Sequence, residues 1–193
     1  MLTTAAGAEL LVCQFPQALV FEGPTAGLTV ASSPMGCLDM AVSKRYAGII
    51  IYFSARKIRA RDALIELCAD LTTLALTRAT PKCVSLDCRH RALFLKLQEA
   101  GIENVEIRLP AEVVDPWKMW AGLMAHESSL RIDLHVSRLC PFLRYRPISD
   151  QSELVTCGAY SNRMVLGGSR LREVCQAETY LSCGFYMNPR TTQ

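Results

Sequence analysis

The chain has 193 residues and a net charge of only +3, with 50% hydrophobic and 20% charged residues. This composition is typical of a globular protein and excludes a disordered one, while the small, evenly spread charge argues against a nucleic-acid partner. No apolar stretch reaches the roughly 18–20 residues that a membrane span needs, and the N-terminal run lacks the basic start of a secretory signal. We therefore expect a cytoplasmic protein without a membrane segment, whose nine cysteines are thiols or ligands rather than disulfides.

The first two thirds of the chain alternate between predicted strands and predicted helices. Strands are expected at residues 9–14, 28–33, 47–53, 82–86 and 105–107, and helices at 34–42, 62–76, 89–100 and 116–124. The strand at 47–53 is apolar without alternation, as is typical of a central parallel strand that is covered on both faces. Strands that alternate with helices of this length predict βαβ units, and therefore an α/β fold with a parallel sheet.

Two of these helices have clear start signals, and one later segment is ambiguous. Ser33 precedes Pro34, and Asp115 precedes Pro116, so each polar side chain is placed to cap a helix that opens with proline. Residues 130–136, LRIDLHV, alternate between apolar and polar side chains. We expect them to form an extended connector or an edge strand that leads into the C-terminal tail.

The order and spacing of these elements resemble the receiver domain of response regulators, over roughly residues 9–125. The stretch AGLTVASSPMGCLDMAVSKRYAGIII is similar to that family's second strand, second helix and third strand. The stretch RALFLKLQEAGIENVEIRLP is similar to its fourth helix and fifth strand, with Pro110 at the place of the family's Lys-Pro step. The resemblance implies a receiver-like, flavodoxin-like parallel sheet with flanking helices for residues 1–127.

The residues that carry receiver chemistry are missing at the matching positions. Where the family has an acidic pair, a phosphoacceptor Asp, a Ser or Thr, and a Lys, this chain has Gln14-Phe15, Tyr52-Phe53-Ser54, Asp87-Cys88 and Leu109. Without clustered carboxylates there is no hard oxygen site for Mg²⁺ and no acceptor for a phosphoryl group. The resemblance therefore implies a degenerate receiver-like domain without a phosphoacceptor Asp, in a chain that is not an enzyme.

The C-terminal part of the chain has a different character. Residues 140–189 are rich in Pro and Gly and show no regular apolar period. Four cysteines recur there with 16, 17 and 7 residues between successive ones: Cys140, Cys157, Cys175 and Cys183. A segment that cannot bury enough apolar surface needs another source of order, and four thiolates on one metal centre would supply it. We therefore predict a four-cysteine module over residues 128–193, in which these cysteines bind the cofactor as metal ligands.

The layout Cys-Pro … Cys … Cys-x7-Cys resembles the tail of a number of uncharacterised bacterial proteins, which implies metal binding without an assigned activity. Structural zinc sites usually use closely spaced cysteine pairs, and this tail has none. Widely spaced cysteines suit a [4Fe–4S] cluster better. We expect that cluster, with structural zinc as the alternative. Two disulfides or four unlinked thiols are the plainer interpretations, and His126 or His135 could replace one ligand.

These features together predict a non-catalytic regulatory or adaptor protein that acts in signal transduction. The cluster would stabilise the tail and report redox or iron status, and the α/β domain would dock a protein partner. The alternative is an electron-transfer subunit or an accessory protein of a redox enzyme. Trp117, Trp120 and Met124 on the last α/β helix form either a partner surface or part of the core. The sequence does not indicate the oligomeric state.

Three other groups have plain interpretations. Cys13, Cys37 and Cys68 lie among apolar residues and are expected to be core thiols. Cys88 follows a strand, where α/β sites form, but no histidine stands beside it in the spacing of a base. The basic run at residues 56–61 is expected to be a solvated loop, because four charges make only a weak patch.

Overall fold

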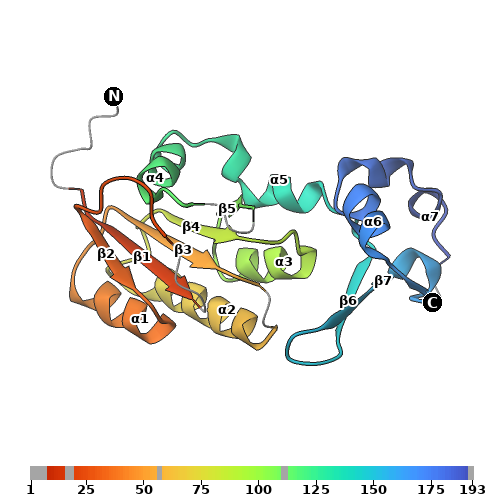
Figure 1. The fold of residues 1–193 in the computed structure, drawn as a ribbon, viewed down its shortest axis with the longest axis horizontal. Helices are drawn as coiled ribbons and strands as arrows, with labels where there is room; N and C mark the ends of the chain where they lie inside the picture. The colour runs from red at the N-terminus through yellow and green to blue at the C-terminus, as the bar shows by residue number, and fades with distance from the viewer. Residues whose placement is uncertain (1–7, 16–19, 56–57, 110–112, 191–193) are drawn as a thin grey trace.

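The computed structural model describes residues 8–15, 20–55, 58–109 and 113–190, and among these it places two sheets of different kinds (Figure 1). The first is a parallel sheet of five strands in the order β2 (Leu28–Ala31), β1 (Leu10–Phe15), β3 (Gly48–Phe53), β4 (Lys82–Leu86) and β5 (Asn104–Ile107). The second is antiparallel, in the order β6 (Leu143–Pro147), β7 (Glu153–Cys157) and β8 (Met164–Val165). Figure 1 shows the parallel sheet on the left and the tail on the right.

Helices cover both faces of the parallel sheet. On one face lie α1 (Pro34–Ser43), α2 (Ile58–Thr73) and α3 (Arg91–Glu99), and on the other lies α4 (Pro116–Met124). This strand order with helices on both faces confirms the expected α/β class and is consistent with a flavodoxin-like fold. The predicted elements agree with the observed ones to within a few residues, and α2 begins earlier than the expected residue 62.

The two expected helix starts are confirmed by hydrogen bonds. Ser33 Oγ accepts a hydrogen bond of 3.1 Å from the backbone N–H of Gly36 at the start of α1. The Asp115 carboxylate accepts from the N–H groups of Trp117 and Lys118, at 2.9 and 3.1 Å. Both caps satisfy donors that the first turn of a helix leaves without an intrahelical partner.

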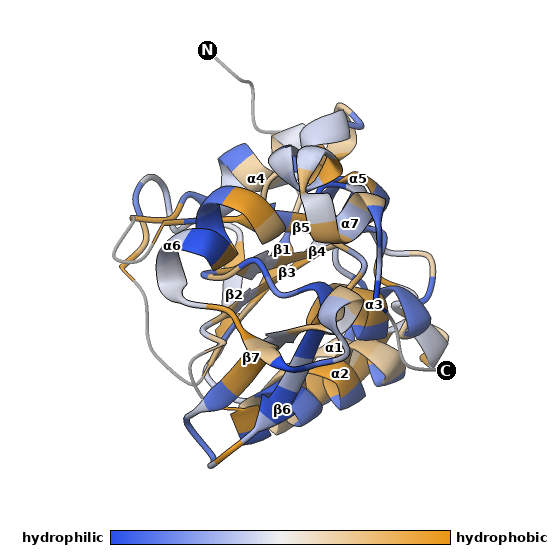
Figure 2. Ribbon diagram, turned by 90° about the vertical axis from the view of Figure 1, so that its right-hand side faces the viewer, coloured by the Kyte–Doolittle hydropathy of each residue, from blue (hydrophilic) through white to orange (hydrophobic). Residues whose placement is uncertain are grey.

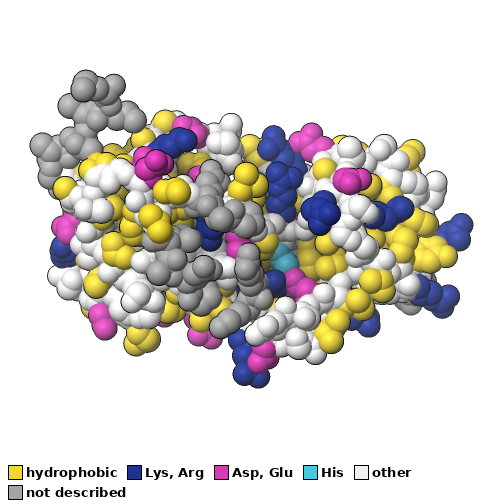
Figure 3. Space-filling view, in the orientation of Figure 1, with side chains coloured by type: hydrophobic (Ala, Val, Ile, Leu, Met, Phe, Trp, Pro, Cys, Tyr) yellow, Lys and Arg dark blue, Asp and Glu magenta, His cyan; other side chains and the backbone are white. Residues whose placement is uncertain are grey.

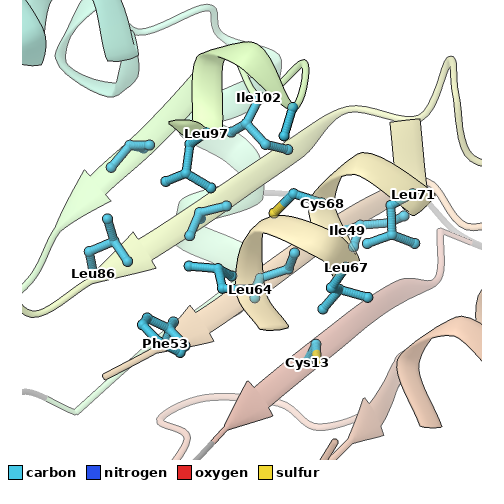
Figure 4. Close-up of a cluster of buried hydrophobic side chains, with 14 of the residues drawn as sticks. Cys13, Ile49, Phe53, Leu64, Leu67, Cys68, Leu71, Leu86, Leu97 and Ile102 are labelled. Carbon is cyan, nitrogen blue, oxygen red and sulfur yellow. The ribbon is translucent and has the colours of Figure 1, made fainter. Parts of the chain in front are cut away.

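The main core lies between the sheet and the α1–α2–α3 face. Every residue of β3 is buried, as its unbroken apolar sequence predicts. In Figure 4, side chains of α2 such as Leu64 and Leu67 lie over Ile49 and Phe53 of β3. The expected core thiols are confirmed as fully buried: Cys13, Cys37 and Cys68.

The opposite face is covered by α4. Trp117 Nε1 donates to the backbone oxygen of Pro24 at 3.0 Å, and the Trp120 ring lies against β3, where a Cβ on Gly48 would come within 2.7 Å of it. Both tryptophans therefore pack on the sheet. Met124 is 40% exposed, so it is the part of the expected partner surface that faces solvent.

The segment after α4 is helical, and the expectation of an extended connector or edge strand at residues 130–136 is wrong. It forms a 3-10 turn, η1 (Ser128–Leu130), followed by α5 (Ile132–Ser137). Ile132, Val136 and Leu139 follow a helical period and pack into the main core. The sequence LRIDLHV fits both periods, and packing against the sheet selects the helical one. Residues up to 139 therefore pack with the α/β part.

The tail consists of the β6–β7–β8 sheet followed by short helical segments. These are η2 (Gly158–Tyr160), α6 (Gly168–Arg170), a π-helical segment η3 (Leu171–Cys175), η4 (Glu178–Ser182) and α7 (Gly184–Met187). The tail was expected to lack an apolar interior, and this is wrong. A small buried cluster forms there from Cys140, Leu143, Cys157, Ala159, Leu166, Cys175 and Tyr180. Figure 2 looks onto the tail and shows the β6–β7 hairpin reaching toward α2; the backbone bond from Ile58 N to Asp150 O confirms this approach.

Candidate metal centre

The four tail cysteines come from four separate segments of the chain. Cys140 follows α5, Cys157 ends β7, Cys175 ends η3, and Cys183 lies between η4 and α7. The first three are buried in the tail cluster, and Cys183 is partly exposed. The backbone N–H of Cys140 donates to the carbonyl oxygen of Cys175 at 2.9 Å, which joins two of these segments directly.

The four thiols influence one another electrostatically. Burial raises the pKa of Cys140, and the nearby Cys157 and Cys183 raise it further. Burial, and then the charges of the other three cysteines, raise the pKa of Cys175 to about 11. Such mutual influence places the four sulfurs in one neighbourhood. With raised pKa values, Cys140 and Cys175 are neutral thiols at pH 7, and binding to a metal would require them to lose their protons.

Cys183 has a thiol that is already biased toward the anion. Burial acts to raise its pKa, but backbone N–H groups of Tyr186 and Phe185 and the guanidinium of Arg170 outweigh burial and lower it. Arg170 Nη2 lies 3.9 Å from Cys183 Sγ. Hydrogen bonds from backbone N–H groups and a nearby cation are the features that stabilise thiolates in metal and iron–sulfur sites.

A second arginine approaches the centre from the α/β part. The charge of Arg91, the first residue of α3, lowers the pKa of Cys140 against the larger effect of burial. The Nε atom of Arg91 is buried and has no hydrogen-bond partner. Cations therefore approach the cysteines from both the tail and the α/β domain. An anionic cluster would be stabilised by this arrangement.

Aromatic side chains surround the cysteines. Tyr186 stands edge-on to both Phe142 and Tyr180, with ring centroids 6.1 and 5.0 Å apart, and Tyr160 lies 5.1 Å from Phe185. In the space-filling view of Figure 3, hydrophobic side chains gather on this right-hand part of the molecule, with Lys and Arg around them. Such a shell limits the access of water, which tunes the potential and stability of a cluster.

The sulfurs are neighbours, but they do not form a closed shell around a single ion. Within the described ranges, no group of three or more His, Cys, Asp or Glu side chains is arranged to hold one metal ion. Four sulfurs on one zinc would lie roughly 3.8 Å apart, given a Zn–S bond of 2.3 Å. A cubane cluster spaces its sulfurs more widely, because each binds its own iron. A cluster of that kind would be held by the four thiols, with the arginines and the backbone donors around them.

The two histidines considered as alternative ligands lie elsewhere. His135 Nε2 is 3.0 Å from the backbone oxygen of Val105, and burial lowers the pKa of this imidazole. His126 has a positive φ of 52° at the end of α4 and lines a cavity with Arg78 and Glu103, at the opposite edge of the sheet. Neither histidine is brought to the cysteines.

A buried ion pair joins the tail to the α/β part, and no local sequence pattern indicates it. Glu153 of β7 accepts two hydrogen bonds from Arg61 of α2, at 2.8 and 3.0 Å. The Nε2 atom of His90 lies 3.1 Å from the same carboxylate, and Tyr145 of β6 stacks on the His90 ring at 3.8 Å. We call these four residues the tail junction.

The tail junction corrects the expected solvated basic loop. The side chain of Arg61 is only 15% exposed, because it is enclosed between α2 and the hairpin. Arg59 does lie in solvent, where it pairs with Asp150 at 2.9 Å. Residues 56 and 57 lie outside the described residues. Arg61 and Glu153 are 92 positions apart, so no local pattern could have linked them.

The carboxylate of the tail junction is held in its charged form. Burial alone would raise the pKa of Glu153, but the hydrogen bonds from His90 and Arg61 outweigh it and hold the pKa at about 2. Removing one partner of such a buried pair costs more stability than breaking an exposed pair, because it leaves the other charge buried and unpaired. The tail is therefore fixed to the α/β domain by a charge that persists at neutral pH.

Further contacts run from the cysteines to the same edge of the sheet. Gln176, next to Cys175, accepts through its backbone oxygen from Arg89 Nη1 at 3.2 Å. The hydroxyl of Tyr145 accepts from the N–H of Arg91 at 3.2 Å. Tyr180 Oη donates to Ser137 O at 2.8 Å. Together these contacts connect the cysteine-bearing segments to the start of α3 and the end of α5.

The edge of the sheet where a receiver has its phosphorylation site is closed by other bonds. Asp87 after β4 accepts from Ser54 Oγ and Ala55 N, at 2.7 and 2.9 Å. Burial raises the pKa of Cys88 to about 12, so this thiol stays protonated. These residues join β3 to β4 and hold a neutral thiol. This agrees with the plain interpretation of Cys88.

Comparison with protein-family models, with curated proteins and with solved structures finds no match to this chain. Membership of the receiver family therefore stays a prediction from the sequence. None of the helices in the described ranges is both long enough and apolar enough to span a membrane.

Proposed function

We propose that Cys140, Cys157, Cys175 and Cys183 hold a [4Fe–4S] cluster, in a non-catalytic regulatory or adaptor protein that reports redox or iron status. The observation that carries this proposal is the packing of Cys140, Cys157 and Cys175, from three separate segments, into one buried cluster, with Cys183 close enough to raise the pKa of Cys140 and Cys175. The aromatic shell and two approaching arginines add to it. A cluster bound there would supply the positive charge that the thiolates need and would link the four segments covalently.

Structural zinc is the alternative occupant of the same cysteines. Zinc sites in small modules usually use two closely spaced cysteine pairs, and the 16, 17 and 7 residues between these cysteines provide none. The bias of Cys183 toward the thiolate serves both metals equally. The preference for the cluster therefore rests on the spacing and on the aromatic shell, and metal analysis decides between the two.

The cluster would report its state through the tail junction. Cys175 adjoins Gln176, which bonds to Arg89, and Cys157 ends the same strand that begins with Glu153. Loss of the cluster would loosen β7 and so weaken the bonds of Glu153 to Arg61 and His90. Because Arg61 lies in the first turn of α2 and His90 caps α3, the α/β domain would then present a changed surface to its protein partner.

Two features support a non-catalytic role. The Cys88 thiol, at the edge of the sheet where α/β enzymes place their chemistry, is held protonated by burial. Asp87, beside it, is occupied by bonds to Ser54 and Ala55. The partner of such an adaptor would be recognised by surface contacts and not by turnover.

An electron-transfer role is the second candidate, and the partial exposure of Cys183 favours it. This cysteine has lower burial than the other three and lies beside Arg170 and Phe185. A cluster with one exposed corner can pass electrons to a docked protein. In that case the tail would keep the same structure in both oxidation states, whereas a sensor would change.

The test is anaerobic purification followed by iron, sulfide and zinc analysis and a visible spectrum. A broad band at roughly 400 nm is expected for an iron–sulfur cluster. Reversible reduction without a change in protease sensitivity would favour electron transfer, and a change in sensitivity would favour a sensor. A colourless protein that contains zinc would show that the four cysteines hold structural zinc and not the cluster. Neither metal in freshly isolated protein would overturn the proposal.

A further inference from the structure

A cavity of about 500 Å³ lies on the α4 face of the parallel sheet, apart from the cysteines. Its lining includes residues at the carboxyl ends of β3 and β5 and at the start of α4. Its lining includes Tyr52, Glu106, Arg108, Asp115, Lys118 and Leu130. Cavities of about 300–1,000 Å³ are the usual size for small-molecule sites. The carboxyl ends of parallel strands are also where open α/β sheets bind small molecules.

Two polar groups that line this cavity are buried without a hydrogen-bond partner. They are the hydroxyl of Tyr52 and the Nε atom of Arg108. Tyr52 is 1% exposed and Arg108 is 7% exposed. Arg108 does bond through Nη2 to the backbone oxygen of Phe53, at 3.3 Å, which fixes its guanidinium beside the cavity. Buried polar atoms are nearly always paired, so two orphans on one cavity indicate a missing acceptor.

The hydroxyl of Tyr52 acts as a donor at any physiological pH. Burial raises the pKa of this phenol, and the nearby carboxylates of Glu106 and Asp115 raise it further. The neutral phenol can therefore donate a hydrogen bond to a ligand, and Arg108 Nε can only donate. A single kind of ligand atom, an anionic or carbonyl oxygen, would satisfy both orphans.

The remaining charges limit what else the ligand can carry. Four carboxylates and two cations are found among the described residues of the lining: Glu22, Glu106, Asp115, Glu127, Arg108 and Lys118. Two of the carboxylates are already engaged, since Asp115 caps α4 and Glu106 accepts from Ser85 Oγ at 2.9 Å. The excess of negative charge disfavours phosphates and nucleotides. A ligand that presents a carboxylate to the two donors and a cation to the rim suits the cavity.

We propose that this cavity binds a small zwitterionic metabolite of the α-amino acid class. Its carboxylate accepts hydrogen bonds from Tyr52 Oη and Arg108 Nε, and its ammonium group faces the carboxylates of the rim. The site stands on residues of the α/β part alone. It is therefore independent of the iron–sulfur proposal, and its success or failure leaves that proposal untouched.

The experiment is a titration of the full-length holoprotein with each of the standard L-amino acids, followed by calorimetry and thermal shift. Three comparison probes are used. Acetate presents only the carboxylate of an amino acid, a primary amine presents only the ammonium group, and inorganic phosphate presents the wrong charge. At least one amino acid is expected to bind in the millimolar range or tighter, and more tightly than any of the three probes.

The deciding variant is Tyr52→Phe, because it removes one hydroxyl and keeps the ring. Loss of one hydrogen bond to the ligand's carboxylate is expected to weaken amino-acid binding by about tenfold or more. The matched control is Tyr46→Phe, since Tyr46 is a buried tyrosine outside the cavity. This variant should bind the amino acid as tightly as the native chain does. Because Tyr52→Phe removes an unpaired buried hydroxyl, the unliganded variant should be at least as stable as the native chain.

Three results would overturn this proposal. The first is no binding of any amino acid at millimolar concentration to folded protein. The second is preferential binding of phosphate, which would contradict the argument from charge. The third is an equal affinity of Tyr52→Phe and the native chain for the same amino acid, which would place the ligand elsewhere.

Discussion

Seven of the nine cysteines fall into two groups, and the surroundings of the two groups are opposite in kind. Cys13, Cys37 and Cys68 lie in the main core among Leu, Ile and Phe side chains. The pKa of Cys13 is raised by its contact with Cys37 and by burial, and burial raises that of Cys68. At Cys68, burial outweighs the opposing charge of Lys82, so the thiol stays protonated and these cysteines behave as small apolar side chains.

The tail cysteines are also close together, but polar groups reach them. Backbone N–H groups and Arg170 lower the pKa of Cys183, and Arg91 acts in the same direction on Cys140. Clustering of sulfur alone therefore does not mark a metal centre. The donors and cations around the sulfur distinguish a ligand set from a packed core, and the predictions below test that distinction.

The largest difference between the groups is expected on removal of one thiol. Cys157→Ser should lose most of the bound iron and leave the tail open to protease, because a serine is a poor ligand for the cluster. Cys68→Ser should keep its iron and lose only about 1–3 kcal/mol of stability through a buried hydroxyl. Iron content and limited proteolysis measure both effects. Equal protease sensitivity of the two variants would contradict this account.

The next largest difference between the two groups of cysteines is expected in the rate at which their thiols react. In protein freed of metal by a chelator, Cys183 is expected to be alkylated at least about a hundredfold faster than Cys68, since it is partly exposed and its pKa is lowered. Mass spectrometry of peptides after timed iodoacetamide treatment gives both rates. Comparable rates would show that Cys183 has no special bias toward the thiolate.

The tail junction should contribute strongly to stability. Glu153→Gln is expected to lower the free energy of unfolding by about 3 kcal/mol, because it leaves Arg61 buried without its anion. Asp150→Asn is the matched control, since it breaks the exposed pair with Arg59 and should change little. Urea unfolding of both variants tests this. A loss in the control equal to that in Glu153→Gln would contradict a special role for the junction.

The same carboxylate predicts a pH dependence. The pKa of Glu153 is about 2 in the folded protein against 4.5 for the ordinary group. A depressed pKa adds stability that is fully present above the unfolded value and is lost as the pH falls from about 4.5 toward 2. The stability difference between native chain and Glu153→Gln should therefore shrink over that range. A difference that stays constant down to pH 2 would exclude ionised Glu153 as its source.

The smallest effect is expected from a change confined to the α/β part. Ser33→Ala removes the cap of α1 and should cost about 1 kcal/mol of stability. Its iron content should stay that of the native chain, because α1 lies on the far side of the core from the tail. A parallel loss of iron would mean that the two parts are less separate than their cores indicate.

The parallel sheet could be predicted from local sequence, because each of its elements has its own signal. The apolar run of β3 and the caps at Ser33 and Asp115 are readable within a few residues. The error at residues 130–136 has a physical cause. LRIDLHV satisfies a strand period and a helix period together, and only the sheet it packs on decides.

The centre and its surroundings could be predicted in part. Cysteine spacing pointed to the four sulfurs, but Arg91, Arg170 and Glu153 carry no local pattern that links them to cysteine. Arg61 and Glu153 meet across 92 positions. The small apolar cluster of the tail was missed as well, because its members come from short, irregular segments. The proposal of a ligand in the cavity beside α4 depends on two orphaned atoms that sequence cannot show.

Quantitation of iron, acid-labile sulfide and zinc in protein isolated without oxygen tests the central claim most directly. The account predicts iron and sulfide in equal amounts, in the proportions of one [4Fe–4S] cluster per chain, with loss of both in Cys157→Ser and retention in Cys68→Ser. Protein that is folded, protease-resistant in its tail and free of all three elements would contradict it.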